Sequence, residues 1–487
     1  MLLSAPAWGA EGRPIDQLYP AARLIFPQAD RFTPLGGAPP HAWVYRGGRR
    51  IGVLYRSQDI LAIPAYSGRP LNILVGLDLE GRIAGLRIVA HQEPILAVGV
   101  SEADLAAYIH QYEGKSAYDR VRIGAYDRPG YVGIDGISGA TITSMVANAT
   151  VMRTARQVAE ALDLAPGAHR RDSAAEEPSI WLVIWQQRKL KIALLGAGLL
   201  ALGVILVFQD WLARRPRLLA RLRRAYLLYT VIFIGGFALA QLSVVNVLTF
   251  VHAVMHEFDW QTFLAEPMLF LLWSFVAVTL LLWGRGVYCG WLCPFGALQE
   301  LLFQAAQRLR LPAFEFPQMV HERLWAVKYI ILLGLFGLSL QSLPNAQVAA
   351  EVEPFKTVVV MRFDREWPFV LYAAALLGVA LFNRKFFCRY LCALGAALTY
   401  PAKFRIFEWL RRRKECGRPC QICANECEVR AIHPTGEINA NECHYCLDCQ
   451  VTYWNAYKCP PLVERRKRRE RSRRVAVAAP NPAGRGG

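Results

Sequence analysis

Five apolar stretches beyond residue 189 constrain the fold of this chain more than any other feature. They cover residues 190–208, 225–248, 267–283, 326–343 and 367–382. A helix needs roughly 20 apolar residues to cross the hydrocarbon core of a membrane, so about five spans are expected, of which the third and fifth are short. The chain is 54% hydrophobic and 19% charged, whereas an ordinary globular domain has roughly 25% charged residues. The sequence therefore predicts a polytopic helical membrane domain over residues 179–405.

The basic residues between these stretches predict which side of the membrane each end faces. The loop after the first stretch carries six arginines, whereas residues 249–266 contain neither Lys nor Arg. Because positively charged loops stay on the cytoplasmic side, residues 1 to about 189 are expected outside and everything after Phe382 inside. All 12 cysteines lie between Cys289 and Cys459, and this orientation places each of them at a cytoplasmic helix end or beyond. We expect a multi-pass protein of the inner (cytoplasmic) membrane.

The region before the first apolar stretch predicts an extracytoplasmic domain over residues 11–178. Residues 42–96 contain alternating apolar and polar residues, and the segment from Asp78 to Gly81 is typical of a hairpin turn between two such runs. Residues 1–10 end in small residues, as the remnant of a signal peptide would, or form a disordered tail. With strands in front and helices behind, the chain is expected to be a multi-domain α+β protein.

The segment DGISGATITS, from Asp135 to Ser144, predicts a phosphate site at the start of a helix. Small residues allow a ligand to approach the backbone, hydroxyl groups can bind its oxygens, and the helix N-terminus favours an anion. These residues are Ser138, Gly139, Ala140, Thr141 and Thr143. An ordinary Ser/Thr helix cap is the alternative that the residues alone leave open.

Eight cysteines near the C-terminus form two closely spaced runs, which read C-x3-C-x2-C-x3-C and C-x2-C-x2-C-x9-C-P. They are Cys416, Cys420, Cys423 and Cys427, followed by Cys443, Cys446, Cys449 and Cys459. The order resembles that of two-cluster ferredoxins, in which three cysteines of a run hold one cluster and the fourth holds the other. Zinc ribbons are the alternative. We place a ferredoxin-type domain at residues 406–462.

The ferredoxin resemblance implies two [4Fe-4S] clusters. It assigns one cluster to Cys416, Cys420 and Cys423 with Cys459, and the other to Cys443, Cys446 and Cys449 with Cys427. The chain departs from the usual pattern at two points, since the first gap is three residues rather than two and Glu428 stands where a proline is usual.

Two further cysteine pairs close the third and fifth apolar stretches as an internal repeat. The segments RGVYCGWLCPFGAL and RKFFCRYLCALGAA share an arginine four residues before the first cysteine and a glycine three residues after the second. Because residues i and i+4 share a helix face, the four thiols are expected to meet at the cytoplasmic surface. The sequence leaves open a further metal or cluster, a redox-active dithiol, or plain packing. The four residues are Cys289, Cys293, Cys388 and Cys392.

The last residues, 463–487, carry the basic run ERRKRRERSRR. Such a run is typical of a disordered tail held near anionic lipid. No segment resembles a nucleic-acid-binding module, so we expect no nucleic-acid partner.

The string SGATIT resembles the flavinylation motif of exported FMN-binding domains, as in the Rnf and Nqr complexes. The resemblance implies that the hydroxyl of Thr143 is joined to FMN through a phosphodiester by a flavin transferase. It also implies that the segment from His91 to Pro94, with His91 and Glu93, lies beside the isoalloxazine ring, and a hairpin exit loop is the alternative for this segment.

Together, the flavin motif, the five apolar stretches, the paired C-x3-C segments and the terminal ferredoxin runs resemble the NosR/NirI family of membrane flavo-iron-sulfur proteins. That family is linked to denitrification, chiefly to nitrous oxide respiration. The resemblance implies electron transfer between cytoplasmic clusters or the quinol pool and FMN in the periplasm, in support of nitrous oxide reductase or its maturation proteins. A redox-sensing regulator of denitrification genes and an assembly scaffold are the alternatives. The sequence does not identify an independent enzymatic substrate.

Overall fold

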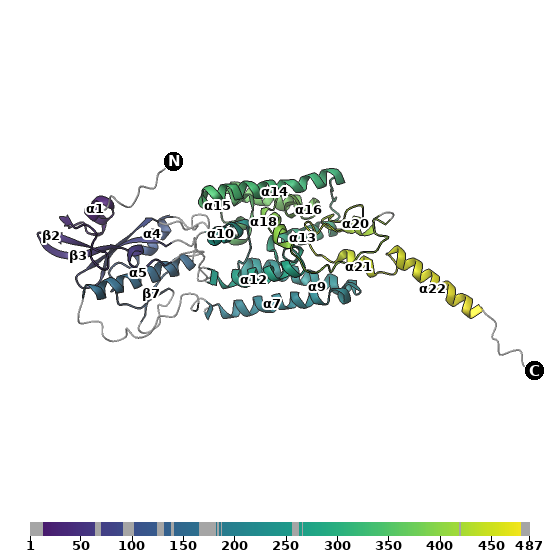
Figure 1. Ribbon diagram of the computed structural model, residues 1–487, viewed down its shortest axis with the longest axis horizontal. Helices are drawn as coiled ribbons and strands as arrows, with labels where there is room; N and C mark the ends of the chain where they lie inside the picture. Colours follow the sequence, from purple (N-terminus) through teal and green to yellow (C-terminus); the bar gives the residue numbers. More distant parts are fainter. Residues whose placement is uncertain are drawn as a thin grey trace, which may run out of the picture. The chain divides into compact units, whose positions relative to one another are not determined.

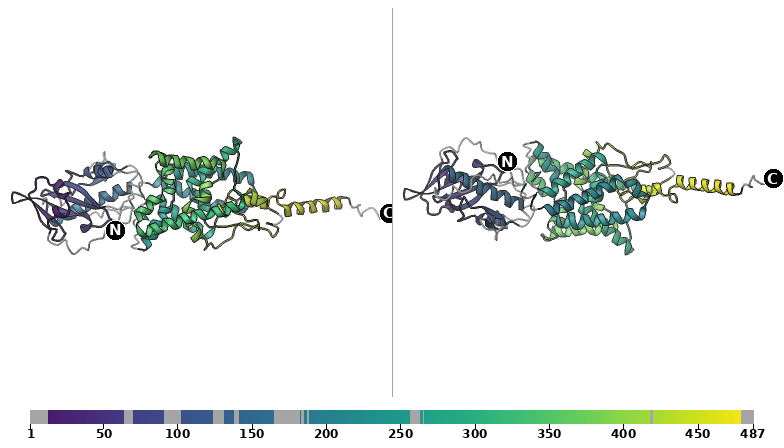
Figure 2. Two further views of the ribbon diagram at one scale, coloured as in Figure 1. Left: turned by 90° about the horizontal axis from the view of Figure 1, so that it is seen from above. Right: turned by 90° about the horizontal axis from the view of Figure 1, so that it is seen from below.

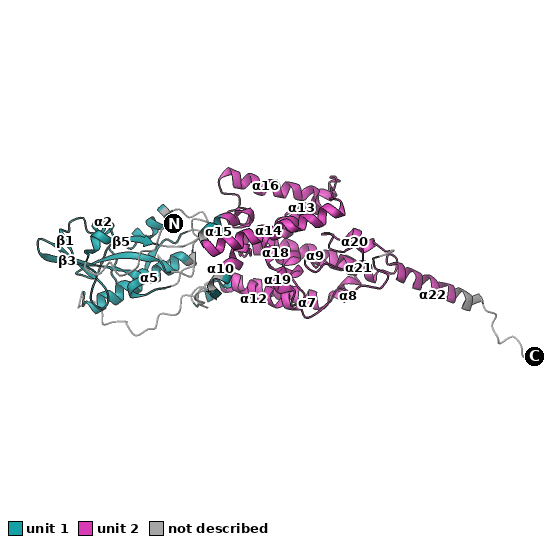
Figure 3. Cartoon of the chain, turned by 45° about the horizontal axis from the view of Figure 1, so that its top comes forward, with its two compact units in different colours: residues 1–188, 249–267, 342–348 teal, residues 189–248, 268–341, 349–487 magenta. Residues whose placement is uncertain are grey.

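The chain divides into two compact units in the computed structural model (Figure 3). Unit 1 comprises residues 1–188, 249–267 and 342–348, and unit 2 comprises the rest of the chain. The division after Arg188 lies ten residues beyond the boundary predicted at 178/179. The residues that the structure describes are 13–63, 70–90, 102–123, 131–137, 141–164, 182, 185–186, 188–255, 263–264, 266–417 and 420–478.

Unit 1 is built on an antiparallel sheet with strand order β1-β2-β3-β4-β5. The strands are β1 (Arg31–Phe32), β2 (Ala42–Arg46), β3 (Arg49–Arg56), β4 (Asn72–Asp78) and β5 (Ile83–Ala90). The predicted hairpin is confirmed, because Asp78 ends β4 and its Oδ1 accepts the backbone N–H groups of Glu80 and Arg82 at 2.9 and 2.7 Å. Gly81 supplies the positive φ of 73° that this turn requires.

Helices cover both faces of this sheet. The long helix α5 (Thr141–Ala161) lies along one face, where Val151, Ala155 and Val158 pack on the buried side chains of β3 and β4 (Figures 1 and 2). The short helices α1 (Ile15–Leu18) and α2 (Ala22–Ile25) pack on the other face. The remaining elements of the domain are α3 (Ser57–Ile60), α4 (Glu102–His110) and the parallel pair β6 (Val121–Ile123) and β7 (Val132–Ile134). Residues 1–10 and residues 165–178 lie outside the described residues.

Unit 2 is a bundle of apolar helices. Two of its helices are long and apolar enough to cross a membrane: α7 (Lys189–Val207) and α14 (Gln318–Gln341). Two shorter apolar helices, α12 (Pro267–Leu282) and α16 (Trp367–Phe382), coincide with the third and fifth predicted stretches. The predicted count of five spans is therefore not confirmed for the described part of the chain.

The second predicted stretch does not form one continuous helix. Helix α9 (Pro216–Tyr229) continues as the π-helical segment η3 (Thr230–Phe237), and α10 (Val244–Met255) follows after a break. Helix α8 (Gln209–Ala213) precedes α9 in the chain. Between α14 and α16 lie α15 (Leu343–Ala349), η5 (Ala350–Val352) and η6 (Lys356–Val360).

The C-terminal cysteine runs belong to unit 2 and do not form a separate unit. Their loops carry only the short helices α20 (Ile422–Glu426) and α21 (Asp448–Trp454). Helix α22 covers Pro460–Ala478, so the disordered tail predicted over 463–487 is corrected for the residues up to 478. The helix forms because Pro460 follows Cys459 at its first turn, where proline is tolerated, and an Arg466–Glu470 pair supports it at i,i+4.

Candidate functional site

The start of α5 carries the predicted flavin segment. Thr143 lies in the first turn of this helix and its side chain is 2% exposed. The hydroxyl of the neighbouring Ser144 accepts the N–H of Ile137 at 3.0 Å, so it ties the chain before the helix to the helix itself. Ser138, Gly139, Ala140, His91 and Glu93 lie outside the described residues, as does the side chain of Thr141.

Two buried tyrosines hold this end of α5 in place. Tyr108 donates from its hydroxyl to the carbonyl oxygen of Ser144 at 2.7 Å, and Tyr112 donates to Asn148 Oδ1 at 2.9 Å. Burial raises the pKa of Tyr108, and it likewise raises that of Tyr112. Both phenols therefore stay neutral donors at physiological pH, and they fix the first turns of α5, in which Thr143 lies buried.

The eight C-terminal cysteines come together in the two predicted groups. One cavity is lined by Cys416, Cys420, Cys423 and Cys459. A second cavity is lined by Cys427, Cys443, Cys446 and Cys449. Each cavity contains three neighbouring cysteines of one run and the last cysteine of the other, which is the exchange that the ferredoxin order predicts.

Backbone groups around these cavities are oriented towards sulfur. The N–H of Arg413 points at Cys416 Sγ at 3.3 Å, and the N–H of Tyr445 points at Cys443 Sγ at 3.4 Å. Hydrogen bonds to ligand sulfurs are a feature by which proteins tune iron–sulfur clusters. The sulfurs of Cys416 and Cys443 are therefore placed as hydrogen-bond acceptors.

The spacing of the sulfurs tests the zinc alternative. Zinc binds thiolates at about 2.3 Å, so a tetrahedral site holds its sulfurs about 3.8 Å apart. Among the described residues, which include all twelve cysteines, no three sulfurs lie within 4.8 Å of one another. No three of the described sulfurs therefore have the mutual spacing of a tetrahedral zinc site.

The two C-x3-C segments share one local structure. In the first, η4 (Tyr288–Leu292) ends before Cys293, which begins α13 (Pro294–Arg308). In the second, α17 (Phe386–Tyr390) ends before Cys392, which begins α18 (Ala393–Ala397), followed by α19 (Thr399–Ala402). The sulfurs of these two cysteines accept the N–H groups of Gly296 at 3.4 Å and Gly395 at 3.2 Å. Each pair spans a helix break, so the expected i,i+4 arrangement on one helix face is wrong.

These thiols lie in the interior of unit 2. Cys293, Cys388 and Cys392 are 6–8% exposed and belong to its main hydrophobic cluster, with Cys289 packed against it. Cys392 Sγ is 4.0 Å from an Oε of Glu353, which lies between the fourth and fifth apolar stretches, in a loop that the predicted orientation of five spans puts outside. The thiols are therefore buried within the unit, and their position at the cytoplasmic side of the membrane stays a prediction.

The repeated arginines connect both C-x3-C segments to the second cysteine cavity. Arg285, four residues before Cys289, pairs with Glu442 at 3.3 Å. Arg384, which holds the same place in the second copy, pairs with Glu428 at 2.8 Å. Because Glu442 precedes Cys443 and Glu428 follows Cys427, each copy of the repeat contacts one side of the same cavity.

Glu428 is the centre of a buried ionic network. Its carboxylate accepts from Arg223 of α9 at 2.8 Å, from Arg384 at 2.8 Å and from Lys385 at 3.3 Å. Burial alone would raise the pKa of Glu428, but the charges of these three basic side chains outweigh it and hold the pKa well below its ordinary range. The carboxylate is therefore charged and fully paired at neutral pH.

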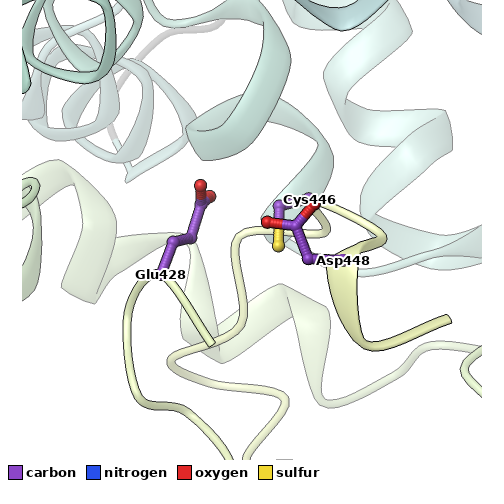
Figure 4. Close-up of side chains that lie close together, drawn as sticks. All are labelled: Glu428, Cys446 and Asp448. Carbon is purple, nitrogen blue, oxygen red and sulfur yellow. The ribbon is translucent and has the colours of Figure 1, made fainter. Parts of the chain in front are cut away.

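Glu428, Cys446 and Asp448 also satisfy the spacing of a metal site, since their ligand atoms lie within 4.8 Å of one another. Figure 4 shows Glu428 on one loop and the other two residues on the next. A cation there would lie beside Arg223, which contacts both Glu428 and Asp448. We therefore assign this group to the ionic network and not to a metal.

The backbone of the second cysteine run contacts the first C-x3-C segment directly. A Cβ placed on Gly290 would lie 1.7 Å from the carbonyl oxygen of His444, and one on Gly286 would lie 2.6 Å from that of Cys443. Trp291 Nε1 also donates to the carbonyl oxygen of Tyr445 at 3.0 Å. Only glycine permits this approach at positions 286 and 290, so the segment from Gly286 to Trp291 accommodates the cysteine loop.

Three family models match this chain. The model of the FMN-binding domain matches residues 66–156, and that of the 4Fe-4S binding domain matches 266–312 and 366–415. The NosR model matches residues 414–470. The segments matched by the 4Fe-4S model include both C-x3-C pairs.

Regulatory protein NosR of Pseudomonas aeruginosa is 37% identical to the chain over 685 aligned positions, which cover 97% of the chain and 96% of that protein. The chain belongs to the NosR/NirI family. NosR of Stutzerimonas stutzeri is 57% identical over 308 residues, or 63% of the chain and 42% of that protein. Protein NirI of Paracoccus denitrificans is 50% identical over 310 residues, or 63% of the chain and 45% of that protein. This NosR/NirI chain therefore carries an FMN-binding domain and a 4Fe-4S binding domain.

Sequence reasoning missed the acidic residues that join the cysteine runs to the helices of this NosR/NirI protein. Glu428 was noted only as a departure from proline, and Glu442 was not singled out. Lys328 of α14 is fully buried and pairs with Glu442. A signal was present, because a lysine inside an apolar stretch needs an acidic partner.

Proposed function

We propose that this NosR/NirI protein relays electrons across the cytoplasmic membrane between the ferredoxin-like module and FMN on the outer domain. In this proposal the module faces the cytoplasm and residues before Lys189 face the periplasm. The two four-cysteine cavities would each hold a [4Fe-4S] cluster, and the hydroxyl of Thr143 would carry FMN through a phosphodiester placed by a flavin transferase. Iron–sulfur clusters accept one electron at a time, and flavin accepts one or two.

The single observation that carries this proposal is the position of the C-x3-C thiols. On one side, the segment from Gly286 to Gly290, which contains Cys289, touches the backbone from Cys443 to Tyr445. On the other side, Cys392 and the N–H of Leu394 lie at 4.0 and 2.7 Å from a carboxylate oxygen of Glu353, within the segment that the charge pattern assigns to the outer side. The hydrocarbon core is roughly 30 Å thick, too wide for one efficient electron hop, so the thiols supply the intermediate position that a relay needs.

A double variant tests this role. Cys293→Ser with Cys392→Ser should retain FMN and the iron of the terminal module but lose electron transfer between them. The measurement is the rate of FMN reduction after the module is reduced in vesicles of known orientation. Ser274→Ala, on the exposed side of α12, is the matched control. An unchanged rate in the double variant would assign the bridge to a quinone or to another subunit.

The names of the relatives favour a second candidate, since two of them are called regulatory proteins. A redox-sensing regulator of denitrification genes would change the transcript of its target enzyme when the thiols are removed. A relay would leave the transcript unchanged and lower the activity of nitrous oxide reductase or its maturation in the periplasm. Measuring both in the same double-variant strain separates the two functions, and adding quinol analogues tests the quinol pool as the electron source.

A further inference from the structure

Helix α22, which follows the last cysteine of the second run, carries a dense cluster of positive charge. Residues 464–473 contain seven basic and two acidic side chains, which gives a net charge of 7 − 2 = +5 over ten residues. All but Arg466 of these ten are exposed, and Arg466 lies over the ring of Tyr457 at 4.0 Å. Such a density of charge produces a field that extends about a Debye length, roughly 8–10 Å, into the solvent.

The distribution of this charge differs from that of a membrane-surface helix. The five consecutive residues from Arg465 to Arg469 are all basic, and successive positions on a helix are about 100° apart, so the charges encircle the helix. A helix that lies on a membrane needs an apolar face to bury. Within unit 2, α22 also extends away from the apolar helices α7, α12 and α14 (Figures 1 and 2). Both observations favour a soluble partner over lipid.

The position of α22 indicates what that partner does. The helix begins at Pro460, directly after Cys459, and Pro460 and Pro461 line the same cavity as Cys416, Cys420 and Cys423. Tyr457, beside the base of the helix, is 78% exposed. A protein held on α22 is therefore placed next to the first four-cysteine cavity.

We propose that α22 is the docking surface for an acidic soluble electron-carrier protein that exchanges electrons with the cluster held by Cys416, Cys420, Cys423 and Cys459. One electron leaves the reduced carrier and enters the module, so the carrier is oxidised by one electron, the module is reduced by one, and no bond forms or breaks. This inference rests on the proposed relay, for which it names the cytoplasmic partner. Opposite charges raise association rates by about 10- to 1000-fold at low salt.

The test compares two reductants on the full chain in uncharged lipid discs. A purified acidic flavodoxin, fully reduced, is mixed with the protein and the loss of visible iron–sulfur absorbance gives a second-order rate. Replacing Arg465, Lys467, Arg468 and Arg469 with glutamine should lower that rate at least tenfold at low salt and remove most of its salt dependence. A second variant exchanges Arg for Lys and Lys for Arg at the same four positions, which keeps the positive charge. Its rate should equal that of the unmodified protein. Photoreduced deazaflavin, which is small and uncharged, should reduce both proteins equally.

The outcomes are separable. If deazaflavin reduces no cluster in the unmodified protein, the relay itself is wrong. Should deazaflavin work while flavodoxin reduces the glutamine variant as fast as the unmodified protein, the relay stands and the docking surface is refuted. It is also refuted if the glutamine variant loses only its binding to vesicles of anionic phospholipid, since α22 would then be a lipid anchor.

Discussion

Replacing Glu428 with glutamine should destabilise unit 2, because it removes one charge from a buried ionic network. The variant keeps the shape of the side chain but removes its charge. Glu428 pairs with Arg223, Arg384 and Lys385 at 2.8, 2.8 and 3.3 Å, and its side chain is 0% exposed. In the unmodified protein, Glu300 and Asp448 are the other acidic members of this group.

The size of the effect follows from a charge count. Three basic side chains face three acidic ones in this network, so the variant leaves one buried positive charge without a partner. Removing one member of a buried ion pair costs about 3–5 kcal/mol. At roughly 2 °C per kcal/mol for a large domain, the melting temperature should fall by about 6–10 °C. Because Glu428 follows Cys427, the second cavity should lose its iron in the same transition.

The assay is thermal unfolding of the purified protein, followed by helical ellipticity and by iron–sulfur absorbance. Glu470→Gln is the matched control, since Glu470 forms an exposed pair with Arg466 at 3.5 Å and such pairs contribute about 0–1 kcal/mol. A melting temperature for Glu428→Gln that matches the control, with full iron content, would show that the network does not hold the module on the helices.

Three further changes test the other sites. Gly290→Ala places a Cβ 1.7 Å from the carbonyl oxygen of His444, and since contacts under 3.0 Å do not occur, the loop must move at least 3.0 − 1.7 = 1.3 Å. We expect this variant to lose iron and to reduce FMN more slowly. Gly196→Ala, whose Cβ meets nothing within 4 Å, is the control and should change neither property. Thr143→Val should abolish the flavin fluorescence that follows the band on a denaturing gel, and a fluorescent mutant band would place the linkage elsewhere. Cys446→Ser should remove about half of about eight iron atoms measured by chemical analysis, and stoichiometric zinc instead of iron would refute the cluster assignment.

The grouping of the eight terminal cysteines could be predicted from their resemblance to two-cluster ferredoxins. In such ferredoxins each run supplies three cysteines to one cluster and its fourth to the other, and the linings of the two cavities contain these sets. The role of Glu428 could not be predicted in this way. Its partner Arg223 lies 205 residues earlier in the chain, and no spacing rule connects the two.

The C-x3-C segments show a different limit of sequence reasoning. Their i,i+4 spacing fits a continuous helix, but the backbone at Cys293 and Cys392 is extended, with ψ of 113° and 104°. Pro294 signals the break in the first copy, since proline favours the first turn of a new helix. The second copy has Ala393 at this position and breaks in the same way. There the fold of the unit, and not a local residue, determines the conformation.

The long separation between Arg223 and Glu428 has a consequence for how the protein is made. A ribosome adds roughly 5–20 residues per second, so the 205 residues between the two take about 10–40 s to synthesise. During that time α9 is complete while Arg223 lacks its carboxylate. Lys328 is likewise synthesised before its partner Glu442, which follows 114 residues later. The apolar helices therefore reach their final arrangement only after the last cysteine loops have left the ribosome, and a nascent chain that stops before Glu428 should be a substrate for membrane quality-control proteases.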